Sequence, residues 1–172
     1  MFERLRRLFR RSRSGPAGEA SPVAHRDPFS TPFEPDLPAR MREAHAALRA
    51  AFELAQDSER RGEHDRVMAH LGAFDQLLRN YLVRPMVPFH DYLVDRFGAD
   101  ADRLHALRSA RAQLRLLSHE VRDVVQPRKP DPNRSPPALG RTLEEWAASL
   151  RETLSKQERD LLPLYRPADA GE

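Results

Sequence analysis

The stretch VMAHLGAFDQLLRNYL, residues 67–82, decides the fold class of this 172-residue chain. Its apolar residues recur every three or four positions, as on one face of a helix: they are Val67, Leu71, Phe74, Leu78 and Tyr81. This spacing predicts an amphipathic helix that buries one face. Pro85 continues the same face, and a proline inside a helix costs about 3 kcal/mol. We therefore predict a kink or break between Pro85 and Pro88.

Three further segments show the helical spacing, and strand signals are nearly absent. The predicted helices span residues 37–61, 63–84, 101–126 and 138–162, and the second resumes after Pro88 and ends at Gly98. Asp36 is the expected N-cap of the first helix and Gly62 its stop. A stretch with five prolines, residues 127–137, separates the last two helices. This pattern predicts an all-α fold, an antiparallel four-helix bundle.

The chain divides into four predicted parts. Residues 1–13 form a basic amphipathic tail, and residues 14–35 form a flexible, disordered linker rich in Ser, Pro, Gly and Ala. The bundle spans residues 36–165, and residues 166–172 form a short disordered tail. The formal net charge is +3, but residues 1–13 contribute +5 through six arginines and Glu3. The folded part is therefore mildly acidic, and the basic character belongs to the tail.

The N-terminal tail carries apolar residues at near-helical spacing among its arginines, as an interfacial amphipathic helix does. We predict weak contact with an anionic membrane surface, at about 1 kcal/mol per arginine. The alternative is a basic tail without a binding role, and specific nucleic-acid binding is not expected. The predicted contact residues are Phe2, Arg4, Leu5, Arg6, Arg7, Phe9, Arg10 and Arg11.

Composition excludes several classes of site and activity. The chain contains no cysteine, which excludes disulfides, thiolate metal sites and cysteine nucleophiles. No apolar run approaches the roughly 18 residues of a membrane span, and no secretory signal is seen, so we expect a cytoplasmic protein. Glycine-rich phosphate loops and Ser-His-Asp patterns are absent, so we expect no enzyme. His64 and His70, with Glu63 and Asp65, are interpreted as a solvated helix surface.

Three segments together resemble the hemerythrin-like (HHE cation-binding) family. The first is FEPDL followed by EAHAAL, residues 33–37 and 43–48. The second is LLRNYLVRPMVPFHDYL, residues 77–93, and the third is TLSKQERDLLPLY, residues 153–165. Their order and separation are similar to those of the family. The resemblance implies a four-helix bundle whose inward His and Glu side chains bind iron.

Carried over position by position, the resemblance implies a degenerate metal site. His45 and Glu158 match ligand positions, and His105 lies near a third one. Non-ligand or altered residues stand at the other three, namely Tyr81, Pro85 and Thr153. The remaining candidate ligands are therefore His45, His105, Glu158 and Tyr81. We expect no cofactor, and iron if any metal binds. Arg111, inside an apolar stripe, is expected to pair with Glu158 in place of metal.

The resulting prediction is a non-enzymatic hemerythrin-like bundle that acts through contacts with an unknown protein partner, in a regulatory role. It is expected in the bacterial cytoplasm, with the N-terminal tail on the inner face of the membrane. One alternative is an iron- or oxygen-binding sensor with an incomplete ligand set. Another is a sigma-factor-binding regulator, since the segment from Phe74 to Tyr92 also resembles the regulator of sigma D family.

Overall fold

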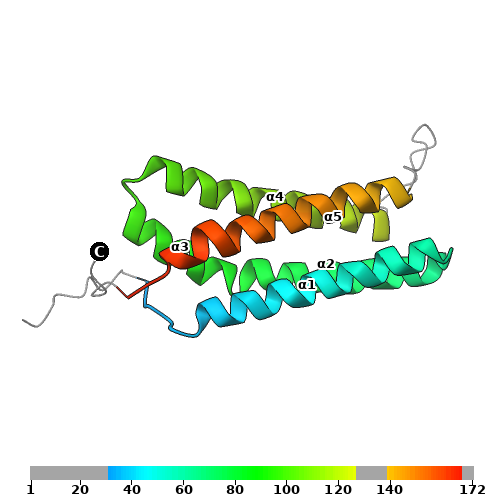
Figure 1. The fold of residues 1–172 in the computed structure, drawn as a ribbon, viewed down its shortest axis with the longest axis horizontal. Coiled ribbons are helices and arrows are strands. Elements are labelled where there is room, and N and C mark those ends of the chain that lie inside the picture. Colours follow the sequence, from blue (N-terminus) through cyan, green and yellow to red (C-terminus); the bar gives the residue numbers. More distant parts are fainter. Residues whose placement is uncertain (1–30, 127–138, 168–172) are drawn as a thin grey trace, which may run out of the picture.

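The computed structural model describes residues 31–126 and 139–167, and these residues form helices and loops without any strand. Four long helices lie side by side (Figure 1): α1 (Leu37–Arg60), α2 (His64–Val83), α4 (Ala101–Val125) and α5 (Leu139–Lys156). Successive long helices run in opposite directions, so the predicted all-α antiparallel bundle is confirmed. A shorter helix, α3 (Met86–Phe97), links α2 to α4 at one end of the bundle.

The core forms where the apolar faces of the long helices meet. Helix α1 packs against α2 and α5, and α4 packs against the same two helices, so each long helix has two neighbours. The five residues of the opening stripe, Val67, Leu71, Phe74, Leu78 and Tyr81, are all at most 2% exposed. The periodicity of the sequence therefore identified the buried face of α2 correctly.

Gly62 ends α1 and allows the tight turn into α2. Its φ of 70° lies in the left-handed region, which is costly for residues with a Cβ. The Gly62 N–H donates to the Glu59 carbonyl and the Glu63 N–H to the Ser58 carbonyl, both at 2.9 Å. These two bonds form the Schellman motif, which satisfies carbonyls that the helix end leaves open. The predicted stop at Gly62 is thus confirmed.

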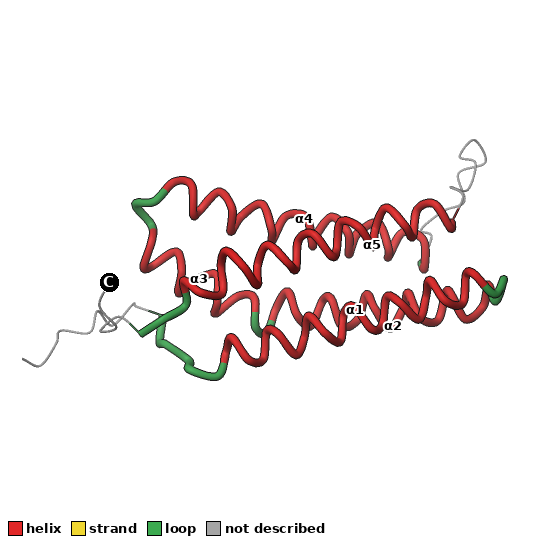
Figure 2. Tube along the Cα trace, in the orientation of Figure 1, coloured by secondary structure: helices red, strands yellow, loops and turns green. Residues whose placement is uncertain are grey.

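The predicted break at Pro85 is also confirmed, and it separates α2 from α3. Helix α2 ends at Val83 and α3 begins at Met86, with a short non-helical segment between them (Figure 2). Pro88 lies in the first turn of α3. A proline is tolerated there because the N–H groups of a first turn have no helical acceptor.

The last helix differs from the prediction of one continuous helix over residues 138–162. Helix α5 ends at Lys156 and is followed by a π-helical turn, η1 (Gln157–Leu161), and a 3₁₀ turn, η2 (Leu162–Leu164). Pro163 explains part of this change, because it has no N–H to continue the helical ladder. The wider π turn begins at Gln157, where the chain contributes to a buried polar cluster.

The folded domain begins earlier and ends later than predicted. Phe33, assigned to the linker, stacks on the Tyr165 ring with centroids 5.0 Å apart, and the Glu34 N–H donates to the Tyr165 hydroxyl at 2.9 Å. At the other end, Arg96 donates to the Arg166 carbonyl at 2.9 Å. These contacts correct the boundaries at residues 36 and 165, because aromatic packing holds the flanking residues. The N-terminal tail with its predicted membrane contacts, and the stretch 127–137, lie outside the described residues.

Within residues 31–126 and 139–167, none of the helices combines the length and the apolar character needed to span a bilayer.

Candidate functional site

His45 lies at the centre of a polar cluster inside the bundle. Its side chain is 0% exposed, on the inward face of α1. Its Nδ1 is 2.8 Å from Glu158 Oε1, and its Nε2 is 2.8 Å from the Tyr81 hydroxyl. The Tyr81 hydroxyl is also 2.5 Å from Gln157 Oε1. Three of the four predicted ligands, His45, Tyr81 and Glu158, are thus brought together by α1, α2 and η1.

Arg49 completes this cluster at its solvent edge. One helical turn after His45, its guanidinium lies 3.0 Å from Glu158 Oε1, the oxygen that also faces His45. Both Arg49 and Glu158 are about one third exposed at the side chain. The carboxylate is therefore held between an imidazole inside the bundle and a cation at its surface.

The surroundings set the protonation of the cluster. Burial lowers the pKa of His45, and the opposing effect of the Glu158 hydrogen bond and charge does not restore it. Burial on its own raises the pKa of Glu158, but the hydrogen bond from His45 and the charge of Arg49 outweigh burial, and the net pKa is lowered. Burial, and then the Glu158 charge, raise the pKa of Tyr81 well above its usual value. At neutral pH the cluster contains a neutral imidazole, a carboxylate and a phenol.

This protonation state fixes the direction of the hydrogen bonds. The neutral His45 ring has one proton, which Nδ1 donates to the Glu158 carboxylate, so Nε2 accepts the proton of the Tyr81 hydroxyl. The amide of Gln157 must then donate to the Tyr81 oxygen. Gln157 Nε2 is buried without a partner, and a half-turn of the amide places it against Tyr81. The chain of donors runs from Gln157 through Tyr81 and His45 to Glu158.

Arg111 does not pair with Glu158, which corrects the sequence prediction. Its Nε is buried without a hydrogen-bond partner, and the cation that Glu158 contacts is Arg49. Arg49 lies on α1, one turn from His45, and the antiparallel packing of α1 against α5 brings it to Glu158 at the start of η1. A sequence search for i, i+4 polar neighbours of His45 would have found Arg49 as a candidate.

The other positions of the implied ligand set make no hydrogen bond to His45 within the described residues. His105 is exposed on α4 and therefore does not face the cluster. Thr153 is 2% exposed and donates to Gln113 of α4 at 2.9 Å. Pro85 lies at the break before α3.

The cluster does not fit the di-iron centre that the resemblance implies. Such centres use inward His and Glu side chains from all four helices. Here α2 supplies a phenol whose raised pKa opposes the phenolate form, and α4 supplies no histidine to the cluster. Both ring nitrogens of His45 are engaged by protein groups, and the Arg49 cation lies at the carboxylate where a metal ion would carry its charge. Within the described residues, no group of three His, Cys, Asp or Glu side chains is arranged to hold a metal.

Asp75 is a second buried polar group. The sequence pattern does not single it out, because it lies next to Phe74 on the apolar face. It is 5% exposed and accepts from Ser118 of α4 at 2.8 Å. The Arg79 and Arg122 guanidiniums lie 3.2 Å and 3.5 Å from its other oxygen. These contacts join α2 to α4 and compensate the buried charge.

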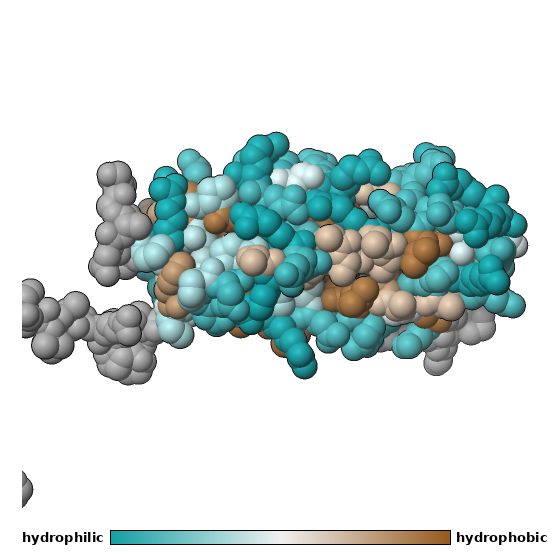
Figure 3. Space-filling view, turned by 60° about the horizontal axis from the view of Figure 1, so that its bottom comes forward, coloured by the Kyte–Doolittle hydropathy of each residue, from teal (hydrophilic) through white to brown (hydrophobic). Residues whose placement is uncertain are grey.

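The outer side of the α1–α2 pair presents an apolar surface. We call this the apolar α1–α2 face, and its residues are Ala47, Ala51, Leu54, Ala73 and Leu77. Leu54 is 52% exposed and Leu77 38%. Figure 3 shows apolar side chains gathered over these helices, with hydrophilic residues around them.

Comparison with protein-family models, with curated proteins and with solved structures finds no match for this chain. The hemerythrin-like resemblance thus remains a prediction carried by its three sequence segments.

Proposed function

We propose that this protein is a non-enzymatic helical bundle that acts by binding another protein in a regulatory role. The apolar α1–α2 face is the observation that supports this proposal. Its alanines allow close approach of a partner backbone, and Leu54 and Leu77 offer apolar anchors. An amphipathic helix laid along such a face is a common mode of protein recognition. We place this activity in the cytoplasm, which agrees with a chain that contains no cysteine.

The interior cluster also supports this proposal, because its side chains are not free to bind a metal. A working iron or oxygen sensor needs ligands free to bind metal, whereas His45, Tyr81 and Glu158 bind one another and Arg49. The structural role of this cluster leaves the surface as the functional part of the bundle.

Site-specific crosslinking tests the partner proposal. A photoreactive phenylalanine derivative is placed at Leu54 or at Leu77, and in the matched control at Leu116, which is 60% exposed on α4. We expect one discrete crosslinked protein from the first two positions in a lysate of the producing cells. Equal crosslinking from Leu116, or none from any position, would contradict the proposal.

Metal content separates this proposal from the sensor alternative. The purified chain is loaded with ferrous iron under anaerobic conditions, desalted and measured by mass spectrometry. We expect well below one iron per chain, with no change in Tyr81→Phe. Two irons per chain would establish a di-iron protein, and one iron lost on His45→Gln would establish a mononuclear site.

The sigma-factor alternative makes a narrower statement about the same face. It predicts that the crosslinked protein is a sigma factor, whose identity peptide mass spectrometry would give. The rim of the face carries both acidic and basic residues, among them Asp57, Glu63, Arg61 and Arg66. An acidic rim would favour the sigma-factor alternative, and this rim carries charges of both signs.

A further inference from the structure

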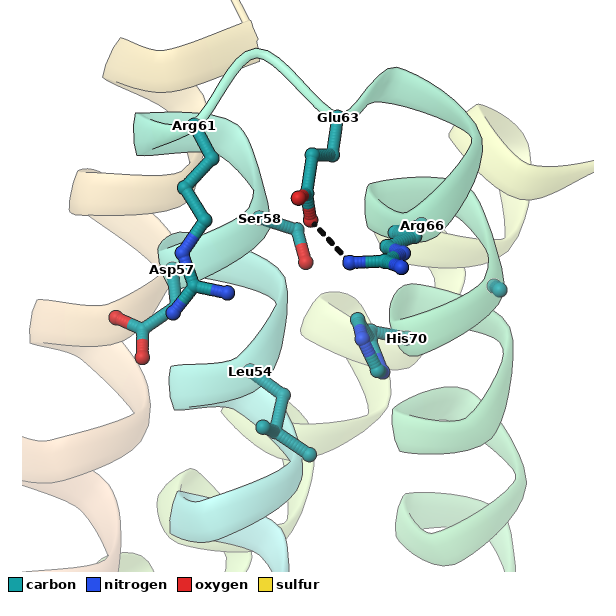
Figure 4. A pocket seen from close by; sticks show the side chains of 8 residues that line it. Leu54, Asp57, Ser58, Arg61, Glu63, Arg66 and His70 are labelled. Atoms are coloured by element: carbon teal, nitrogen blue, oxygen red, sulfur yellow. Dashed lines mark hydrogen bonds and ion pairs between the residues drawn. The ribbon is translucent and has the colours of Figure 1, made fainter.

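A pocket of about 360 Å³ lies at the end of the bundle where α1 turns into α2 (Figure 4). We call it the hairpin pocket. Its lining comes from the last turns of α1, the connecting turn and the first turns of α2, and comprises Leu54, Asp57, Ser58, Arg61, Glu63, Arg66, Ala69 and His70. The Schellman motif at Gly62 fixes the two helix ends that form its walls.

Among residues 31–126 and 139–167, three hydrogen-bonding side chains of this pocket have no protein partner. Ser58 is 4% exposed, yet its hydroxyl makes no hydrogen bond within the described residues, and it points into the pocket in Figure 4. The Arg61 guanidinium and the His70 imidazole likewise have no hydrogen bond or ion pair there. Buried polar groups in folded proteins normally have partners. Only Ser58 is buried in this sense, whereas His70 is half-buried and Arg61 is exposed. Because all three line one pocket, they offer hydrogen-bond donors to a ligand that supplies acceptors.

The charges around the pocket favour an anion. Glu63 pairs with Arg66 at 3.0 Å, and Asp57 pairs with Arg60 just outside the lining. These two pairs neutralise both carboxylates, and among the described residues Arg61 is left as the pocket arginine without an ion pair. A guanidinium binds a carboxylate with two parallel hydrogen bonds, which makes this pairing stronger than a neutral hydrogen bond.

The apolar part of the pocket indicates which group the ligand carries beside its anionic group. Leu54 lines the pocket and belongs to the apolar α1–α2 face, so the pocket is continuous with that face. Ala69 adds a second small apolar contact from α2. A ligand that fills this space needs an aliphatic group beside its anionic group.

We propose that the hairpin pocket binds a carboxylate carried next to an aliphatic group, with Arg61, Ser58 and His70 as its donors and Leu54 as its apolar contact. A free organic acid and an acidic residue on the helix of a protein partner both present this chemistry. The pocket inference stands apart from the proposed function, and only the second of these sources depends on it.

Titration with N-acetyl-L-leucine, followed by amide NMR of the full chain, tests the pocket. We expect saturable shifts confined to the residues around Ser58, Arg61 and His70, with a dissociation constant on the order of 1–10 mM for so small a probe. The neutral analogue N-acetyl-L-leucinamide has the same aliphatic group without the charge. It should bind at least about tenfold more weakly.

Two variants identify the donors. Arg61→Gln should weaken binding of N-acetyl-L-leucine about tenfold, and Ser58→Ala about threefold, in keeping with the loss of a charged and of a neutral hydrogen bond. Arg115→Gln removes an exposed arginine of α4 and is the matched control, expected to leave binding unchanged. The absence of binding, equal binding of the amide, or equal loss in the Arg115 variant would overturn the proposal.

A second experiment shows whether the carboxylate belongs to a free acid or to a partner protein. Arg61→Gln is introduced into the chain that carries the photoreactive residue at Leu77, which lies outside the pocket lining. A strong drop in crosslinked partner assigns the carboxylate to the partner protein, whereas unchanged crosslinking beside lost binding of N-acetyl-L-leucine assigns it to a free acid. If crosslinking fails while N-acetyl-L-leucine still binds, the proposed function is overturned and the pocket proposal stands.

Discussion

The interior cluster around His45 and the hairpin pocket both contain a histidine and an arginine. The two regions differ in whether their polar side chains have protein hydrogen-bond partners. In the cluster, both ring nitrogens of His45, the Tyr81 hydroxyl and the Glu158 carboxylate have protein partners at 2.8–3.0 Å or closer. In the pocket, Ser58, Arg61 and His70 have none within the described residues. Polar groups that satisfy one another contribute to the stability of the fold. Those that remain open are available to a ligand.

The largest expected effect comes from removing the large aromatic side chain of the cluster, Tyr81. Tyr81→Ala deletes a 2% exposed ring and the hydroxyl bound to His45, so we expect the free energy of unfolding to fall by about 4 kcal/mol. Urea denaturation measures this change. Leu116→Ala, at an exposed position of α4, is the control and should cost less than about 0.5 kcal/mol. Similar losses for the two variants would show that the cluster is not part of the core.

Deleting only the Tyr81 hydroxyl separates the contribution of its hydrogen bonds from that of the packed ring. Tyr81→Phe retains the ring but leaves His45 Nε2 and the Gln157 side chain buried without their partner. We expect a loss of about 2 kcal/mol in the free energy of unfolding, which is typical when a buried hydrogen bond is broken on one side. An unchanged stability would mean that the hydrogen bonds of the cluster contribute nothing beyond packing.

The cluster should also make stability depend on pH. The pKa of His45 is lowered from 6.5 by burial, so below pH 6.5 the unfolded chain binds a proton that the folded chain does not. Stability is therefore full above pH 6.5 and falls on acidification towards the folded pKa, by up to about 1.4 kcal/mol per pH unit. The lowered pKa of Glu158 adds a further loss only below its usual value of 4.5.

Denaturation midpoints between pH 7 and pH 5, about the range in which only His45 of this pair responds, measure this effect. His45→Gln should flatten the profile, while His105→Gln, at an exposed position, should retain it. A profile that stays steep in the His45 variant would assign the pH dependence to other groups.

The smallest effect is expected at the pocket, and it is the counterpart of Tyr81→Phe. Ser58→Ala also removes a single hydroxyl from a buried residue, but that hydroxyl has no partner in the part of the chain that the structure describes. We expect the free energy of unfolding to change by less than about 0.5 kcal/mol, because no hydrogen bond is lost. A loss as large as that of Tyr81→Phe would show that the Ser58 hydroxyl is satisfied within the fold, and the two regions would no longer differ.

Much of the fold could be read from local patterns. The helical spacing of Val67 to Tyr81, the stop at Gly62 and the break at Pro85 each depend on a few neighbouring residues, and all three are confirmed. The juxtaposition of His45, Tyr81 and Glu158 was implied by the hemerythrin-like resemblance, and the structure brings the three side chains together. The π turn at Gln157 was missed, since helix spacing alone does not reveal an added residue in a turn.

The sequence by itself determined the all-α class, the buried stripes and the residue types available for polar contacts, because helix formation and amphipathicity are properties of short segments. Only the tertiary structure decided which cation meets Glu158, where His105 points, and that Ser58, Arg61 and His70 surround one pocket. Such choices depend on the register between helices far apart in the chain. A shift of one residue turns a helical side chain by about 100°, so partners across the bundle are set by packing.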